Sequence, residues 1–388
     1  MRRHTMVGFG LVTAFVLAMS TVAAAVANPP TKIGQGEGHL SVLAWAGYAE
    51  NGSNDPKVDW VTPFEKQTGC QVDVKVFNTS DEAFQLFHTG QYDVVSASGD
   101  SFLRSVVNGD AAVINTKLVT TYKDLAPFLK NKPWNTYKGK PYGVPHGWGA
   151  NLLMYNENTV KPAPNSWGVV FDKNSPYAGK LTAYDSPIYI ADAALYLEKS
   201  KPSLKITNPY SLDSKQFKAA VDLLKQQKQN IGEYWSDYLK EQEAFTKGSL
   251  VLGTTWQVIT NLVQADKTSP PVKAIIPKEG STAWSDNWQV YKNTKHLNCS
   301  YKWLNWITSP KVQAQVAEWF GEAPANLKAC ADTTDPNHCK TYGANNKSFY
   351  SKLSYWTTPT TKCLDGRTNT KCVAYKDWAA AWDVIKGS

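Results

Sequence analysis

The strongest constraint on the fold of this chain is the regular alternation of short apolar runs with segments of helical periodicity. Residues 40–44 and 92–95 have the length and apolar character of strands, and Val72, Val74 and Val76 alternate as the residues of a half-buried strand do. The segments between them are long enough for helices. Strands that alternate with helices in this way indicate an α/β architecture.

Capping residues predict where several helices begin and end. Asp55 followed by Pro56 predicts the start of the first helix, Gly69 predicts its end, and Pro63 is a candidate kink within it. Ser80 predicts the start of a second helix. Apolar spacing predicts two later helices, one through Phe217, Val221 and Leu224, and one from Ser309-Pro310 through Val312, Val316 and Phe320.

The chain has 388 residues, about twice the length of a usual single domain, so two lobes are expected. Glycine and proline interrupt residues 141–155 and 275–277, and these stretches are candidate crossings between lobes. We therefore expect a discontinuous first lobe, an inserted second lobe and a cleft between them. The predicted divisions are 28–38 for an N-terminal linker, 39–146 and 284–325 for lobe one, 147–283 for lobe two, and 326–388 for a C-terminal disulfide-tied segment that the sequence assigns to neither lobe.

Residues 1–27 have the organisation of a cleaved secretory signal peptide. An arginine pair precedes an apolar run at residues 7–19, and Ala25-Val26-Ala27 supplies a small-residue cleavage site before Asn28. A membrane anchor is the alternative, but this run is shorter than the roughly 20 residues needed to span a bilayer. No cysteine lies near the cleavage site, so a lipid anchor is not indicated. The sequence predicts a free periplasmic or secreted protein.

Composition and charge favour a packed globular protein without a nucleic-acid partner. Charged residues make up 19% of the chain and hydrophobic residues 42%, which is not typical of a disordered chain. The formal net charge of +8 falls to +6 when the two signal arginines leave, since lysine plus arginine falls from 41 to 39 against 33 acids. No dense basic patch accompanies this mild charge, so nucleic-acid binding is not expected.

Six cysteines in an exported chain predict disulfides, because thiols pair in an oxidising compartment. Spacing alone leaves the fifteen possible connectivities formally open. Zinc is the alternative partner for the thiols, but the short Cys-x-x-Cys pairs that bind tetrahedral zinc are absent. The spacing from Cys330 to Cys339 equals that from Cys363 to Cys372, which suggests that each of these pairs closes a short loop. Cys70 and Cys299 then remain as a possible long-range bridge.

Trp284 and Asp286 form the clearest candidate for a binding site. Two residues apart in a strand, they are expected to point to the same side. An indole face attracts an ammonium group and a carboxylate gives it charge-assisted hydrogen bonds, so the pair suits an organic cation. Similar side chains follow other predicted strands, as in a pocket assembled from strand ends, namely Trp45, Tyr48, Asp185 and Trp256.

An ordered series of short motifs resembles the spermidine/putrescine-binding proteins, the periplasmic receptors of ATP-driven polyamine importers. No single motif is diagnostic, but their order and spacing agree over most of the mature chain. The motifs are Ala44-Trp45-Ala46-Gly47-Tyr48, residues 92–98 (Tyr-Asp-Val-Val-Ser-Ala-Ser), Ser166-Trp167, Asp185-Ser186-Pro187, Gly253-Thr254-Thr255-Trp256, residues 276–280 (Ile-Pro-Lys-Glu-Gly) and residues 321–326 (Gly-Glu-Ala-Pro-Ala-Asn).

The resemblance implies a type II periplasmic-binding fold of two α/β lobes that close on a ligand in the cleft between them. It implies a small cationic ligand, a membrane permease as partner, no cofactor and no catalysis, and we expect a monomer. In this family, aromatic side chains enclose the ligand's methylene chain and aspartates bind its amines. The matching residues are Trp45, Tyr48, Trp256, Trp284, Asp286 and Asp185, with Ser98 or Asp100 in a serine loop where Gly99-Asp100 resembles an insertion.

Three departures from the family pattern affect the expected ligand. Ile188 and Ile259 stand where relatives carry carboxylates, so one amine anchor is missing or moved. Glu322 stands where a tyrosine is common and can restore the negative charge elsewhere in the cleft. Because an unpaired buried ammonium costs several kcal/mol, fewer anchors favour a shorter, singly charged or modified amine.

Other interpretations of these residues remain open. Asp185 can cap the following helix, Glu322 can be a solvated charge at a helix end, and His146 can satisfy backbone groups near a hinge. A quaternary ammonium, an amino-acid derivative or a sugar is an alternative ligand, and a secreted carbohydrate-active enzyme is the alternative class. The Gly-x-Ser-x-Gly and His-Glu-x-x-His motifs are absent. Several tryptophans have the spacing of core helix residues, namely Trp303, Trp306, Trp319, Trp378 and Trp382.

Overall fold

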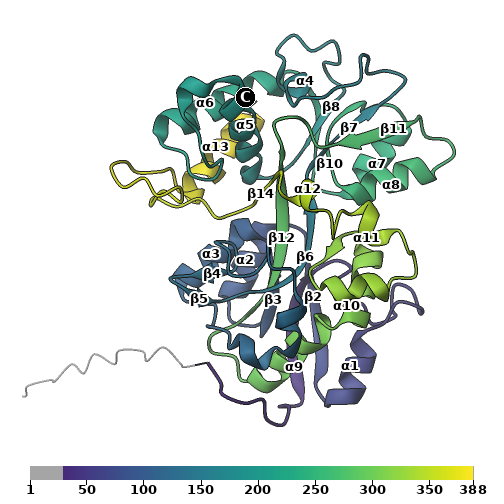
Figure 1. The fold of residues 1–388 in the computed structure, drawn as a ribbon, viewed down its shortest axis with the longest axis vertical. Coiled ribbons are helices and arrows are strands. Elements are labelled where there is room, and N and C mark those ends of the chain that lie inside the picture. Colours follow the sequence, from purple (N-terminus) through teal and green to yellow (C-terminus); the bar gives the residue numbers. More distant parts are fainter. Residues whose placement is uncertain (1–28, 388) are drawn as a thin grey trace, which may run out of the picture.

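The apolar runs form two separate β-sheets, each in the middle of one lobe (Figure 1). The structure is a computed structural model that describes residues 29–387, and the predicted signal peptide lies outside them. The first sheet contains β1 (His39–Trp45), β2 (Gln71–Phe77), β3 (Val94–Ala97), β6 (Val144–Ala150), β12 (Ser281–Val290), β13 (Ala323–Pro324) and β14 (Leu353–Tyr355). The second contains β7 (Leu152–Asn156), β8 (Leu181–Tyr184), β9 (Ile231–Trp235), β10 (Leu252–Thr255) and β11 (Val272–Ile275).

Strand pairing shows a mixed sheet in each lobe. The first sheet has the order β13-β6-β12-β3-β1-β2, with β14 also paired to β12, and the second has the order β11-β7-β10-β8-β9. Strands β1, β2 and β3 run parallel, whereas β12 runs antiparallel to β3 and β6. Parallel neighbours require crossover helices, so the predicted α/β architecture is confirmed. A separate ribbon pairs β4 (Thr136–Tyr137) with β5 (Lys140–Pro141).

Helices cover the sheets of both lobes (Figure 1). The helices of the first lobe are α1 (Val61–Thr68), α2 (Ser80–His88), α3 (Gly99–Asn108), α9 (Leu297–Ile307), α10 (Pro310–Phe320), α11 (His338–Thr341) and α12 (Lys347–Tyr350). Those of the second are α4 (Gly168–Phe171), α5 (Ile190–Ser200), α6 (Ser214–Lys228), α7 (Tyr238–Thr246), α8 (Gln257–Ala265) and α13 (Tyr375–Gly387). Short 3₁₀ helices are η1 (Thr116–Leu118), η2 (Thr120–Asp124), η3 (Pro187–Tyr189), η4 (Pro202–Leu204) and η5 (Leu327–Ala331).

The first helix begins later than the sequence predicts. Asp55 starts a turn, in which its carbonyl accepts from the Val58 amide at 2.8 Å, and α1 begins only at Val61. Aspartate and proline favour turns as well as helix starts, which explains the error. Gly69 ends the helix in the left-handed conformation, as predicted, with φ of 72°. Pro63 lies in the first turn, where its missing N–H costs no helical hydrogen bond.

The chain crosses between the sheets at Asn151, which lies between β6 and β7. The divisions predicted at residues 146/147 and 283/284 instead fall inside β6 and β12. Gly147 and Gly149 suggested a break in the chain, yet both lie within β6. A Cβ at Gly149 would come within 2.5 Å of the Trp284 ring, so that glycine serves close packing and not a turn.

The C-terminal segment, which the sequence assigned to neither lobe, crosses from the first lobe to the second. Strand β14 pairs with β12 in the first sheet, whereas α13 packs against the second lobe near α5 and α6 (Figure 1). The side chains of Trp378, Trp382 and Ile385 are buried in the core of the second lobe. The final helix therefore completes the core of the inserted lobe.

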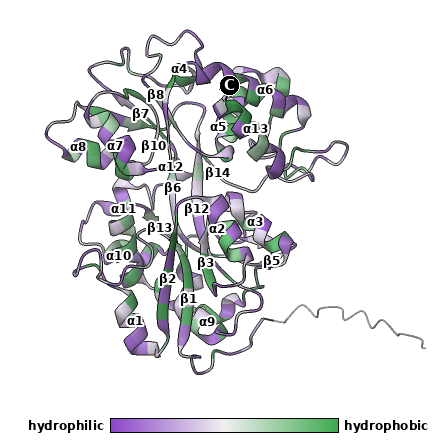
Figure 2. Cartoon of the chain, turned by 180° about the vertical axis from the view of Figure 1, so that it is seen from behind, coloured by the Kyte–Doolittle hydropathy of each residue, from purple (hydrophilic) through white to green (hydrophobic). Residues whose placement is uncertain are grey.

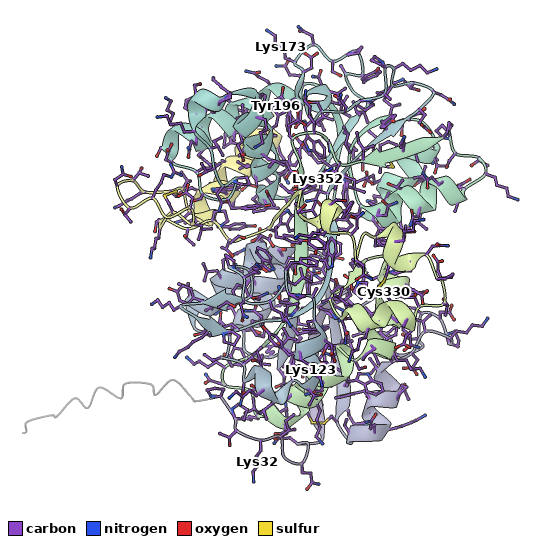
Figure 3. The ribbon with its side chains drawn as sticks, viewed as in Figure 1. Lys32, Lys123, Lys173, Tyr196, Cys330 and Lys352 are labelled. Atoms are coloured by element: carbon purple, nitrogen blue, oxygen red, sulfur yellow. A yellow bond between two sulfur atoms is a disulfide. The ribbon has the colours of Figure 1, made fainter. Side chains whose placement is uncertain are left out.

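Hydrophobic residues concentrate inside each lobe, and the outer loops are mostly hydrophilic (Figure 2). Side chains also fill the region where the lobes meet, near Lys352 (Figure 3). Trp284 belongs to β12 of the first sheet but packs within the core of the second lobe. Within residues 29–387, no helix combines the length and apolarity required to cross a bilayer.

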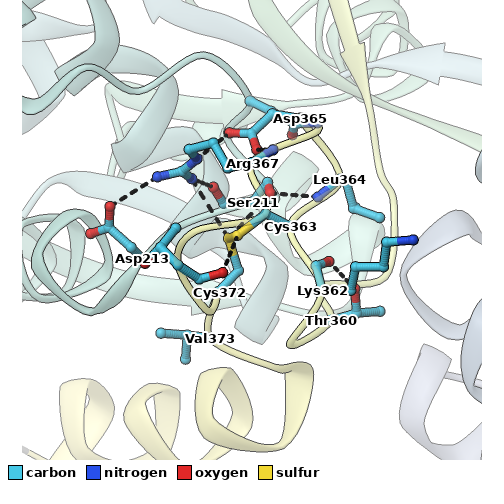
Figure 4. Close-up of a disulfide and its surroundings, with 12 residues drawn as sticks. Ser211, Asp213, Thr360, Lys362, Cys363, Leu364, Asp365, Arg367, Cys372 and Val373 are labelled. Atoms are coloured by element: carbon cyan, nitrogen blue, oxygen red, sulfur yellow. Dashed lines mark hydrogen bonds and ion pairs between the residues drawn. A yellow bond between two sulfur atoms is a disulfide. The ribbon is translucent and has the colours of Figure 1, made fainter.

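The three disulfide pairs suggested by spacing are those of the structure. Cys70–Cys299 joins the start of β2 to α9 across a sequence separation of 229 residues. Cys363–Cys372 closes a short loop that Arg367 fastens to the second lobe (Figure 4). The Arg367 guanidinium pairs with Asp213 at 2.9 Å and donates to the Ser211 carbonyl at 2.6 Å. The loop is thus held by charge-assisted bonds as well as by its disulfide.

We expect the long-range disulfide to contribute most to stability. In the chain-entropy account, closing a loop of this length is worth about 5 kcal/mol, against about 3 kcal/mol for a nine-residue loop. Replacing Cys70 and Cys299 together by serine should therefore lower the free energy of unfolding more than replacing Cys363 and Cys372. Urea denaturation followed by tryptophan fluorescence measures both losses. Equal losses would contradict this expectation.

Candidate functional site

The buried carboxylate of Asp286 binds two hydroxyl groups of the first lobe. Asp286 lies on β12 at an irregularity in its pairing with β6, between Ser285 and Asn287. It is 2% exposed, and its oxygens accept hydrogen bonds from the Ser98 hydroxyl and, at 2.8 Å, from Tyr48 Oη. Burial raises the pKa of Asp286 to about 6, and the two hydrogen bonds partly oppose this rise. Strand alternation alone does not fix its direction, because a bulge re-aims side chains.

Glu322 places a second buried carboxyl group beside the first. The Tyr48 hydroxyl oxygen lies 2.7 Å from Glu322 Oε2, so one hydroxyl bridges both acids. Burial raises the pKa of Glu322 well above its usual range. Glu322 is not a solvated charge at a helix end, because its side chain is fully buried. A Cβ at Gly147 would lie 1.9 Å from Glu322 Oε2, so the glycine makes room for the carboxyl group.

His146 borders the two acids without pairing with them as a cation. Its Nε2 lies 3.8 Å from Glu322 Oε1, but burial lowers the pKa of His146 to about 3, so the ring is neutral at pH 7. The ring packs edge-on against Tyr48 at a centroid distance of 4.5 Å and against Trp288 at 5.6 Å. Neither ring nitrogen has a hydrogen-bond partner within the described residues. The expectation that His146 satisfies backbone groups is therefore wrong.

Two tryptophans from different lobes meet beside the acids. Trp284 packs edge-to-face on Trp256, at the end of β10, with ring centroids 5.9 Å apart. The Trp256 indole donates to Asn151 Oδ1 at 2.9 Å, which ties it to the crossing between the sheets. Phe320 joins the aromatic and acidic halves of the site, because its ring lies 6.0 Å from Trp284 and 4.4 Å from Tyr48. The structure thus brings together five of the predicted residues: Tyr48, Ser98, Trp284, Asp286 and Glu322, with Trp256 against them.

Trp45 and Asp100 make their contacts away from this cluster. The Trp45 ring packs on Phe77 with centroids 4.4 Å apart. Asp100, in the first turn of α3, is fully buried and accepts from the Ser80 hydroxyl at 3.0 Å. Burial raises the pKa of Asp100 to about 7, and the charge of Asp81 adds to that rise. Their predicted contacts with ligand remain predictions.

Asp185 anchors the C-terminal helix. Its carboxylate accepts from the Trp382 indole at 2.8 Å and pairs with Lys386 Nζ at 2.9 Å. Ser186, and not Asp185, caps the following 3₁₀ helix by accepting from the Ile188 amide. Ile188 itself is fully buried in the core of the second lobe. These contacts give Asp185 a structural role that the sequence did not reveal, because α13 is almost 200 residues away in the chain.

The sequence analysis missed a further buried acid, which lies at the crossing between the sheets. Asp192, on α5, accepts from the Tyr184 hydroxyl and from Thr282 Oγ1, the latter at 2.8 Å. Thr282 also accepts from Asn151 Nδ2 at 2.7 Å, so the network continues to the Trp256 indole. Burial raises the pKa of Asp192 to about 7. A lone acid within an apolar helical run was the signal that could have identified it.

Comparisons with known proteins agree with this geometry. The family model for bacterial extracellular solute-binding proteins matches residues 59–342, which is well over half of the chain. This chain belongs to that family. The solute-binding protein is 27% identical to the spermidine/putrescine-binding periplasmic protein of Escherichia coli over 270 residues, or 69% of this chain and 73% of that protein. The resemblance inferred from the ordered motifs is therefore confirmed.

Two solved structures share the two-lobe α/β fold of the solute-binding protein. The TpPotD lipoprotein of Treponema pallidum has a TM-score of 0.71 at 17% identity and covers 90% of this chain and 100% of its own. The MotA binding protein of A. tumefaciens B6, in complex with glucopine, has a TM-score of 0.65 at 17% identity and covers 90% and 99%. At these identities the likeness concerns the fold alone.

Replacing Glu322 by glutamine should change how the stability of the solute-binding protein depends on pH. A carboxyl group whose pKa is raised in the folded state stabilises the fold below its unfolded pKa, and that contribution is lost as pH rises. The wild-type protein should therefore lose melting temperature above about pH 5 relative to Glu322→Gln, which has no proton to lose. Melting curves from pH 5 to 9 measure the difference. Parallel curves would show that the pKa of Glu322 is not raised in the folded protein.

Replacing Asp185 by alanine should destabilise the docking of α13 without weakening ligand binding. The change leaves the Trp382 indole N–H without its acceptor, which costs about 1–3 kcal/mol when the donor is buried. Chemical denaturation and hydrogen exchange in α13 measure the effect. A large loss of ligand affinity with unchanged stability would instead place Asp185 in the ligand site.

Proposed function

We propose that this protein binds a small organic cation of the polyamine class, such as putrescine, between its lobes and delivers it unchanged to the membrane permease of an ATP-driven importer. The observation that carries the proposal is the buried Asp286 carboxylate, which Tyr48 and Phe320 connect to the indoles of Trp284 and Trp256. No lysine or arginine within residues 29–387 forms an ion pair with Asp286 or Glu322. A buried acidic site without a cation of its own suits a cationic ligand.

The chemistry of the site favours an ammonium group attached to a hydrocarbon chain. Asp286 can accept charge-assisted hydrogen bonds from an ammonium, which are roughly twice as strong as neutral ones. Indole faces attract the cation and bury its methylene groups, a contribution of about 0.5–2 kcal/mol for the cation–π contact alone. The name of the Escherichia coli relative specifies spermidine and putrescine, which have this chemistry.

The missing anchors favour a short ligand over a long one. Ile188 and Ile259 are fully buried in the apolar core of the second lobe, so neither position offers a carboxylate to a distant ammonium. A triamine with a central charge would leave one ammonium without an acid. We therefore infer that the ligand carries one or two ammonium groups. MotA, with bound glucopine, illustrates that this fold also accommodates ligands of other classes.

Entry of the ligand requires the lobes to separate. Asp286, Glu322 and Trp284 are 2%, 0% and 5% exposed, and the cavity against Trp284 and Trp256 has a volume of about 10 Å³. A cavity of this size holds about one water molecule and no diamine. A hinge at Asn151 and at residues 276–280, where the chain crosses between the sheets, would open the site. We further propose that the protein acts as a monomer in the periplasm after removal of residues 1–27.

Replacing Asp286 by asparagine should weaken cation binding severely. Losing one partner of a buried charge pair costs about 2–5 kcal/mol, which corresponds to a loss of affinity of about thirtyfold or more. A thermal-shift screen first compares polyamines, quaternary ammoniums, amino acids and oligosaccharides as ligands. Isothermal titration with putrescine then measures the loss of affinity. Asp222→Asn is the matched control, because the Asp222 side chain is half-exposed and its one ion pair within the described part of the chain is with Lys218.

Two outcomes would refute the polyamine proposal. If a sugar or another neutral solute stabilises the protein and polyamines do not, the ligand class is wrong while the family assignment stands. If mass analysis after incubation finds a converted ligand, the protein is an enzyme and not a receptor.

A further inference from the structure

Two acids and a single hydroxyl proton form the centre of the site. Tyr48 Oη lies 2.8 Å from Asp286 Oδ2 and 2.7 Å from Glu322 Oε2. A phenol has one proton and can donate to only one of these oxygens. If both acids were ionised, the carboxylate oxygen that does not receive this proton would face a lone pair of the phenol oxygen at hydrogen-bond distance. Such a contact is repulsive, and in a buried site it is strongly unfavourable.

A proton on Glu322 removes the conflict. The Glu322 carboxyl O–H then donates to Tyr48 Oη, and the Tyr48 O–H donates to Asp286. Asp286 remains ionised, since it also accepts from the Ser98 hydroxyl. Glu322 Oε1 has no hydrogen-bond partner within the described residues, so Glu322 has less support for a negative charge. Burial raises the pKa of Glu322 well above its usual range and that of Asp286 only to about 6.

The groups that surround Glu322 do not supply a compensating positive charge. His146, on β6, is buried with its pKa lowered to about 3. His338, on α11, is within 2.8 Å of the Glu322 backbone carbonyl through Nε2, and burial lowers its pKa as well. Burial raises the pKa of Tyr342, which follows α11, to about 12. None of these three groups is positively charged at pH 7. Among the described residues, the other groups near the pair that can ionise near pH 7 are acids, Asp286 itself and Asp100, whose pKa burial raises to about 7, and they can add only negative charge.

We propose that Asp286 and Glu322 hold one proton between them through Tyr48 in the ligand-free protein, and that a primary ammonium displaces this proton when it binds. Before binding, Glu322–COOH donates to Tyr48 and Tyr48 donates to Asp286–COO⁻. After binding, the ammonium N–H groups donate to the acids, both acids are ionised, and the proton has passed to solvent. A bound diamine is thus exchanged for a proton, so its affinity rises with pH, and the site becomes more selective for N–H donors as pH rises.

This exchange distinguishes a primary ammonium from a quaternary one. A quaternary ammonium has no N–H donor, so it cannot take over the hydrogen bonds that the proton provides. It would bind with the proton retained. Glu322 therefore acts as a specificity-determining group. Gly147 contributes to the same specificity because it makes room for the Glu322 carboxyl group.

The first test needs no ligand and so is independent of the proposed function. The infrared difference spectrum between the ligand-free wild-type protein and Glu322→Gln at pH 7 should contain the C=O band of a protonated carboxyl group that the wild type has and the variant lacks. Glutamine keeps an N–H donor for Tyr48 Oη and is expected to fold. A difference spectrum without that band would overturn the shared proton, whether or not any cation binds.

The second test rests on the proposed function and counts protons. Isothermal titration of putrescine in two buffers of different ionisation enthalpy should show release of about one proton per ligand at pH 7 from the wild type and close to none from Glu322→Gln. Asp222→Asn should behave as the wild type. Binding without proton release, or equal release from Glu322→Gln, would overturn the exchange while leaving the proposed function intact. Absence of putrescine binding would refute the proposed function, and the infrared band would still decide the shared proton.

Discussion

The rest of the structure depends on β12, a strand that is buried along its entire length. All ten of its residues are buried, although more than half are polar, and it pairs with β3, β6 and β14. A buried polar side chain is unfavourable unless it finds a hydrogen-bond partner within the protein. Thr282 therefore binds Asp192 of the second lobe, and Gln289 accepts from Ser105 of α3 at 2.8 Å. The hydrogen bonds of the polar side chains of β12 thus bring elements of both lobes against this one strand.

The candidate site follows from this constraint. Asp286 sits where the pairing of β12 with β6 is irregular, and Trp284 extends from the same strand into the core of the second lobe. A carboxylate buried here without a cation is unfavourable, and among residues 29–387 its hydrogen-bond donors are the hydroxyls of Ser98 and Tyr48. Glu322 adds a second acid to the same hydroxyl. A site of this kind stores unfavourable electrostatic energy that a cation can relieve, which is a physical reason for affinity.

Much of the fold and part of the site could be predicted from residue patterns. The strand signals at residues 40–44 and 72–76 and the Ser309-Pro310 helix start depend on local periodicity and capping, and the structure contains all three. The helix start at Asp55 was wrong because a turn and a helix cap use the same residue types. The glycines of β6 were mistaken for a break because their close neighbours, Trp284 and Glu322, are distant in sequence.

By itself, the sequence determined the alternation of strands and helices and the motifs that place the chain in its family. Its spacing suggested the three cysteine pairs but left the other connectivities open. These features depend on neighbours in the chain or on the order of short segments. Only the tertiary structure decided that Asp185 holds α13, that Asp192 lies at the crossing between the sheets, and that Glu322 shares the Tyr48 hydroxyl with Asp286. The physical reason is that burial and partner geometry set the charge of an acid, and both come from residues brought together across hundreds of positions.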